Sequence, residues 1–195
     1  MKVVMKFGGM SIADEERIKF AANIVSKHYE EGYKIVVVIS ALSGVTDDLQ
    51  EAINRASIGD RKYIEGFIEK LAHRHERIAR AILSQPYAEF FLTELKTRLD
   101  EVKNILLGIS YLREATPRSR DFIMALGERL SALLFCLFLQ SIGLRAKYLC
   151  GWEAGIITDD RYGEARPLMH LVNQLVKGRL NPIVEKGIVP VVTGY

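Results

Sequence analysis

Apolar runs alternate with helical patterns along much of this chain. The run Ile35–Ile39 has no polar alternation, which is typical of a strand covered on both faces in a parallel sheet. Five apolar, β-rich segments are the expected strands: Lys2–Phe7, Lys34–Ser40, Arg145–Cys150, Gly155–Ile157 and Ile188–Thr193. Helical patterns separate most of them. The alternation predicts an α/β fold, with a mainly parallel sheet sandwiched by helices and right-handed crossovers.

The first helix has recognisable ends. Ser11 and Asp14 are spaced as a capping box, and Gly32 is a suitable stop. The apolar positions of one face recur at helical spacing and are Ile18, Ala21, Ala22, Val25 and Tyr29. This pattern predicts a helix with one buried face directly after the first strand, where Val3, Val4, Met5 and Phe7 indicate a short buried strand.

The middle of the chain lacks any convincing strand between Asp47 and about Leu112. Three helical candidates occupy it: Asp47–Ser57, Asp60–Leu83 and Tyr87–Gly108. We interpret residues 47–112 as a helical insertion with a solvated charged face, between the second and third main strands. His73 and His75 are two residues apart and point to different sides of a helix, so we assign them no metal role.

Composition narrows the class of protein. The chain has 195 residues, of which 49% are hydrophobic and 26% charged, and this is ordinary for a soluble domain with one core. The net charge of +3 is too balanced to favour nucleic acid as a partner. Lys6 interrupts the first apolar run, which argues against a signal peptide, and Leu130–Leu144 is too short to span a bilayer. Cys136 and Cys150 have apolar surroundings, so we expect a reduced, cytoplasmic protein.

Two glycines, Gly8 and Gly9, follow the first expected strand and precede a helix. A strand, a glycine turn and a helix start can bring backbone N–H groups close to a phosphate, and Lys6 adds a mobile positive charge beside the turn. A tight turn without a ligand explains the same pair. Neither GxxxxGK[ST] nor GxGxxG is present, so any nucleotide must bind by another loop design.

The second expected strand also ends in polar residues. Ser40 is followed by Ser43, Gly44 and Thr46, and then by a helical pattern. These hydroxyls can simply cap the helix. Alternatively, Ser40 and Thr46 lie beside the Lys6 turn at the carboxyl edge of the sheet, where the two polar edges would form a crevice.

An acidic and a basic residue interrupt the most apolar helix. Glu128 and Arg129 follow Gly127 between two strongly apolar runs. Buried charges are destabilising by several kcal/mol, roughly, unless each finds a partner. Either each meets a structural partner elsewhere, or Glu128 faces a cavity and receives a cationic group of a ligand. The polar stretch Thr158–Gly163 is read as a plain turn rather than a metal site.

Taken in order, these residues resemble the aspartate kinases of the amino acid kinase family. The motifs that carry the resemblance are Lys6-Phe7-Gly8-Gly9-x-Ser11, Ser40-Ala41 with Gly44–Asp47, Gly127–Ser131, Ala154–Asp159 and Val191–Tyr195. They occur in the family's order from one end of the chain to the other. Met10 departs from the pattern, because it stands where the family usually has Thr.

The resemblance implies ATP-dependent phosphorylation of the side-chain carboxylate of L-aspartate, with Mg²⁺, as the first step towards lysine, threonine and methionine. It implies that Lys6 contacts the transferring phosphoryl group and is catalytic. Two further sets of residues are implied: Phe7, Gly8, Gly9 and Ser11, with Lys6, for the nucleotide, and Ser40, Thr46 and Glu128 for aspartate. No protein ligand to a metal is implied.

The resemblance also implies how much of such a kinase is present. Residues 1–195 correspond to the N-terminal, amino-acid-binding part of the catalytic domain, without the nucleotide-binding half and the regulatory ACT domains. We therefore expect this chain alone to be inactive or nearly so, and the full-length protein to be a homo-oligomer. The alternatives are a kinase for another small acid such as acetylglutamate or carbamate, a non-catalytic small-molecule-binding module, or a structural partner that associates through its helical insertion.

Overall fold

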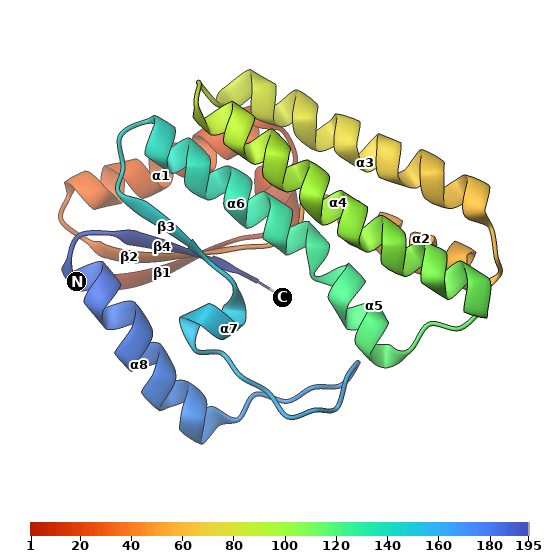
Figure 1. Ribbon diagram of the computed structural model, residues 1–195. Coiled ribbons are helices and arrows are strands. Elements are labelled where there is room, and N and C mark those ends of the chain that lie inside the picture. Colours follow the sequence, from red (N-terminus) through yellow and green to blue (C-terminus); the bar gives the residue numbers. More distant parts are fainter. Residues whose placement is uncertain (195) are drawn as a thin grey trace.

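The structure, a computed structural model, describes residues 1–194. Its centre is a four-stranded parallel sheet with the strand order β1-β2-β4-β3 (Figure 1). The strands are β1 (Lys2–Phe7), β2 (Lys34–Ile39), β3 (Ala146–Leu149) and β4 (Val189–Thr193). The predicted α/β class with a mainly parallel sheet is confirmed.

Helices cover both faces of this sheet. On one face lie α1 (Glu15–Glu30) and α6 (Leu126–Ser141), and on the other lies α8 (Met169–Glu185) (Figure 1). Ile35 and Val37 of β2 belong to the core on the α6 side, whereas Val36 packs with the cluster on the α8 side. The apolar run of β2 is thus covered on both faces, as its sequence predicts.

The helical insertion consists of α2 (Val45–Ser57), α3 (Arg61–Ile82) and α4 (Tyr87–Leu112). In Figure 1, α3 and α4 run side by side, and α4 lies along α6. The remaining short elements are η1 (Gly9–Ile12), α5 (Pro117–Met124) and α7 (Gly151–Ala154). These three helices occupy the region of the predicted insertion, and they form a second helical layer outside α6.

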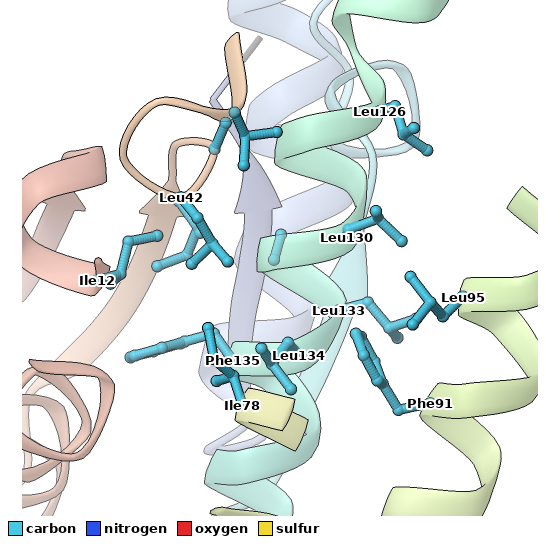
Figure 2. Close-up of a cluster of buried hydrophobic side chains, with 14 of the residues drawn as sticks. Ile12, Leu42, Ile78, Phe91, Leu95, Leu126, Leu130, Leu133, Leu134 and Phe135 are labelled. Atoms are coloured by element: carbon cyan, nitrogen blue, oxygen red, sulfur yellow. The ribbon is translucent and has the colours of Figure 1, made fainter. Parts of the chain in front are cut away.

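The core is centred on α6. Figure 2 shows side chains of this helix between those of Ile12 and Leu42, from the turns after β1 and β2, and those of Phe91 and Leu95 of α4. The run Pro117–Ser141 is long and apolar enough to cross a membrane by length and composition, but 78% of its most apolar window is buried inside the fold. This burial is what a core helix shows.

Three expectations need correction. Gly155–Ile157 is not a strand, because α7 ends there and Gly155 has a φ of +98°, a conformation that ends helices. Val4 is 70% exposed, because its side chain lies on the face of β1 opposite to Phe7, where α8 packs against β2 and β4 instead. At α1 the cap is Asp14 alone, which accepts from the Arg17 N–H at 2.9 Å, while Ser11 lies within η1.

Candidate functional site

Three of the predicted motifs meet around Ala41, just beyond the carboxyl end of β2. A Cβ on Gly9 would lie 2.8 Å from the Ala41 carbonyl oxygen, and a Cβ on Gly127 would lie 2.6 Å from the Ala41 Cβ. Both distances are shorter than real Cβ contacts, so glycine is required at these two positions. The glycine turn after β1, the loop after β2 and the start of α6 therefore form one packed unit.

Hydrogen bonds hold the same unit together. The Ser40 N–H donates to the Phe7 carbonyl at 3.1 Å, and the Ser131 hydroxyl of α6 donates to the Ser40 carbonyl at 2.5 Å. The end of β4 joins them, because the Gly194 N–H donates to the Ile39 carbonyl at 2.8 Å. The unit thus lies at the carboxyl edge of a parallel sheet, where α/β proteins commonly bind ligands.

Glu128 lies in the first turn of α6, within this unit. Its side chain is buried, and its Oε2 atom has no hydrogen-bond partner among residues 1–194. Burial raises the pKa of Glu128, and the backbone N–H groups of Ala41 and of Glu128 itself oppose that rise. The described residues hold no cation within ion-pair distance of this carboxylate. The Glu128 carboxylate is thus oriented by the Ala41 backbone, and its Oε2 atom can accept a hydrogen bond from a bound molecule.

The side chain of the neighbouring Arg129 has different contacts from that of Glu128. Its Nη1 lies 3.9 Å from Glu101 Oε2, and its guanidinium lies over the Phe122 ring, 5.6 Å from the ring centre. The adjacent charges of α6 therefore point to different surroundings, as the helical geometry predicts.

Lys6 lies near the end of β1 with an exposed side chain. It pairs in register with Val38, and among residues 1–194 its amine forms no ion pair. Two other strand lysines, Lys2 and Lys34, both pair with Glu185. Lys6 and Glu128 do not form a pair with each other, and the Lys6 side chain leaves β1 on the face opposite to Phe7.

The other predicted site residues divide into open and enclosed positions. The Phe7 side chain is in the core, 5.8 Å from the Phe135 ring, so only its backbone faces the turn. A Cβ on Gly8 would meet no atom within 4 Å. Ser11 is exposed, and Thr46 is exposed in the first turn of α2. No intramolecular hydrogen bond from the Ser11 or Thr46 hydroxyl is found among residues 1–194.

Met10, the departure from the family pattern, contacts the loop after β2. Its Sδ atom accepts from the Ser43 hydroxyl at 3.3 Å, and its side chain is exposed. The thioether therefore still links the two turns, although it provides no hydroxyl donor.

A cavity of about 680 Å³ lies beside the unit, between Phe122, Arg129, Trp152 and the 156–160 loop. In that loop the Asp159 carboxylate accepts from the backbone N–H groups of Arg161 and Arg166, which lower its pKa. Asp159 thus organises its own turn, as predicted. Residues 1–194 contain no group of three or more His, Cys, Asp or Glu side chains that could hold a metal ion.

The sequence interpretation missed the anchoring roles of Ser131 and of the Ala41 backbone. Ser131 carries no charge to mark it in an apolar helix, and Ala41 acts through atoms that every residue has. Gly127 was the available signal, because a glycine inside a buried helix indicates that another backbone approaches closely.

Comparisons with known proteins identify relatives of this chain. The profile of the "Amino acid kinase family" matches residues 1–195. The chain is 32% identical to "Aspartokinase 2, chloroplastic" of Arabidopsis thaliana over 98% of its own length and 34% of that protein. It is 26% identical to "Aspartokinase" of Mycobacterium bovis over 99% of its length and 32% of that protein. The chain thus spans about a third of the length of these relatives.

A solved structure shows the same fold. E. coli aspartokinase III, in complex with aspartate and ADP, superposes with a TM-score of 0.85 at 23% identity, covering 100% of this chain and 41% of that one. The last residue of the Val191–Tyr195 motif lies outside the residues that the structure describes.

Proposed function

Because this chain belongs to the amino acid kinase family, we propose that it forms the amino-acid-binding side of an aspartate kinase. The reaction transfers the terminal phosphoryl group of ATP to the side-chain carboxylate of L-aspartate and gives 4-phospho-L-aspartate. This product opens the synthesis of lysine, threonine and methionine. The chain spans only about a third of its relatives, so residues 1–195 alone are inactive or nearly so.

The observation that carries the proposal is the unpaired buried oxygen of Glu128. A carboxylate in such a position is destabilising unless a cation or donor meets it. The ammonium group of aspartate is such a cation, and a charge-assisted hydrogen bond to Glu128 would satisfy both groups. The hydroxyls of Ser40 and Thr46, at the same edge of the sheet, are donors for a substrate carboxylate.

The phosphoryl end of the site is formed by the turn after β1. Lys6 is exposed and makes no ion pair in residues 1–194, so its amine is available to the oxygens that gain charge during transfer. Gly8 leaves open space on its Cβ side, which lets a phosphate approach the backbone, and Ser11 follows one turn later. Mg²⁺ enters this proposal with the ATP phosphates, whose charge it neutralises.

The chemistry requires positioning rather than a strong base. The aspartate side chain is already ionised at neutral pH, so it attacks phosphorus without losing a proton. The residues of this chain then hold the two substrates in line and neutralise charge. This requirement fits a site that has one cation, one buried carboxylate and several hydroxyls.

The test uses the complete protein that contains this chain, in an assay of ADP formation with L-aspartate, N-acetyl-L-glutamate and carbamate. We expect turnover with aspartate, and we expect Lys6→Met to lower kcat by about a hundredfold or more. Lys2→Met is the matched control, since Lys2 lies on the same face of β1 at the other end, and its turnover should stay close to wild type.

Three results would contradict the proposal. Turnover only with another acid would indicate a different kinase of the family. No turnover with any acid, together with aspartate binding, would indicate a binding module. An equal loss of kcat in Lys6→Met and Lys2→Met would show that Lys6 has no specific role in the site.

A further inference from the structure

The helical insertion sends one charged side chain into the interior, towards the start of α6. Arg98 of α4 has a side chain that is only 11% exposed, the lowest value among the ion-paired side chains of residues 1–194. A buried guanidinium is tolerated only where its donors are paired. Its contacts therefore show what holds it there.

The donors of Arg98 reach three elements. Its Nε and Nη2 donate to Glu94 Oε2 on the same helix, at 3.2 and 3.0 Å. Its Nη1 donates to the Arg129 carbonyl of α6 at 3.1 Å and to the Tyr148 hydroxyl of β3 at 3.2 Å. Burial opposes the charge, but the hydrogen bonds to Tyr148 and Glu94 and the charge of Glu94 more than offset it, so the pKa of Arg98 is raised.

The Arg129 carbonyl belongs to the residue directly after Glu128. A carbonyl oxygen has two lone pairs, so it can accept from Arg98 as well as from its own helix. On the opposite side of the same helical turn, Ser131 donates to the Ser40 carbonyl and Gly127 packs on Ala41. The first turn of α6 is thus held by the loop after β2 on one side and by Arg98 on the other.

The network continues to the ends of β3 and β4. The Tyr148 hydroxyl lies 3.1 Å from Cys150 Sγ, and Cys150 is the N-cap residue of α7. The next residue, Gly151, donates its N–H to the Thr193 hydroxyl at the end of β4 at 3.0 Å. Arg98 therefore connects the insertion to the carboxyl edge that carries the candidate site.

We propose that Arg98 is a positioning residue, which holds the first turn of α6 so that the Glu128 carboxylate faces the amino group of the substrate. This inference rests on the proposed function. It gives the helical insertion a role in substrate affinity, because movement of α4 would move the peptide next to Glu128.

The experiment measures steady-state kinetics of the complete protein for wild type, Arg98→Met, Arg98→Lys and Arg80→Met. Arg80 is the matched control, because it forms the same i,i+4 pair with Glu76 on the exposed side of the insertion. We expect Arg98→Met to raise KM for aspartate about tenfold or more while KM for ATP stays within about twofold. Arg98→Lys keeps the charge, so its KM for aspartate should lie between those of wild type and Arg98→Met. The two KM values of Arg80→Met should match those of wild type.

Equal changes of the two KM values, or an unchanged KM for aspartate in Arg98→Met, would overturn the positioning role. If Arg98→Met does not fold, Arg98→Lys and Tyr148→Phe carry the same comparison. An unchanged KM for aspartate in both would overturn the role as well.

A second measurement separates this inference from the proposed function. If wild type shows no turnover with aspartate, the proposed function fails, and urea unfolding of Arg98→Met, Glu128→Gln and the double variant then decides on Arg98. A midpoint shift of the double variant that differs from the sum of the two single shifts supports a link between Arg98 and Glu128. A shift equal to that sum contradicts it.

Discussion

Gly8 and Gly9 are adjacent, but the structure gives them different constraints. A side chain on Gly9 would collide with the backbone of the loop after β2, whereas a side chain on Gly8 would meet nothing within 4 Å. Neither residue has a positive φ, so the difference is one of space. Gly9 is required by the fold, and any requirement for glycine at position 8 must come from a ligand.

Alanine at these two positions tests that division. Gly9→Ala should lower the free energy of unfolding by about 1–3 kcal/mol, because the added methyl group forces two backbone segments apart. Gly8→Ala should change it by less than about 0.5 kcal/mol.

In the complete protein, Gly8→Ala should raise KM for ATP about tenfold, since the methyl group occupies space proposed for a phosphate. Urea unfolding and ADP-release kinetics measure both. An unchanged KM for ATP in Gly8→Ala would remove Gly8 from the nucleotide site.

Glu128 should lower the stability of the fold at neutral pH. Burial raises its pKa above the ordinary 4.5, so the folded state holds this proton more tightly than the unfolded state. Stability is therefore lost as pH rises from 4.5 through the folded pKa. Glu128→Gln should unfold at higher urea than wild type at pH 7, and the gain should vanish below pH 4.5. Glu76→Gln, at a half-exposed position, is the control. A Glu128→Gln protein less stable than wild type at pH 7 would contradict this account.

At the scale of elements, periodicity predicts most of the helices and strands, but not how they are exposed. The apolar run of β1 looks buried in sequence, yet Val4 is exposed because the helix on its face of the sheet, α8, packs against β2 and β4. Gly155–Ile157 is too short to distinguish a strand from a helix end, and the close approach of Gly155 to Leu175 decides it. An element's neighbours lie outside any local sequence window.

The helical insertion carries its own pH sensitivity. His75 of α3 is fully buried, and burial lowers its pKa to about 4 from the ordinary 6.5, with a hydrogen bond to the Leu71 carbonyl opposing and the charge of Arg74 adding to the effect. A lowered pKa means that the unfolded state takes the proton first, so stability falls as pH drops below 6.5.

Between pH 7.5 and 5 this difference amounts to about 2 kcal/mol, from 1.36 kcal/mol per pKa unit. His75→Leu should remove that part of the acid sensitivity, and His73→Ala, an exposed histidine two residues away, should keep it. Urea unfolding at the two pH values measures the effect. Equal acid sensitivity in wild type and His75→Leu would show that the pKa of His75 does not differ between the folded and unfolded states.

At the scale of the whole molecule, the sequence indicates the residue types of the candidate site better than the contacts that hold them in place. Glu128 is conspicuous as a carboxylate in an apolar helix, and the structure finds it buried beside Ala41. The contact of Arg98 with Tyr148 joins residues 50 apart, and nothing local in either segment indicates it. We expect Lys6 and Glu128 to open into a common hollow, and this remains a prediction.

The chain by itself should not complete the reaction. It spans 34% of its Arabidopsis relative, and the residues described here provide one side of the proposed site. We expect residues 1–195, with ATP, Mg²⁺ and aspartate, to form ADP at less than about one-hundredth of the rate of the complete protein, because positioning both substrates is most of the catalysis. Robust turnover by residues 1–195 would show that the site is complete within them.

The central claim is that Glu128 receives the amino group of the substrate. The most direct test compares L-aspartate with succinate, which lacks only that group, as substrates of the complete protein. Wild type should prefer aspartate by about a hundredfold or more in kcat/KM, because succinate leaves the buried carboxylate unpaired. Glu128→Gln should reduce this preference at least tenfold, by roughly 1.4 kcal/mol or more. The reduction should come from a lower kcat/KM for aspartate. An unchanged ratio of aspartate to succinate in Glu128→Gln would contradict the account.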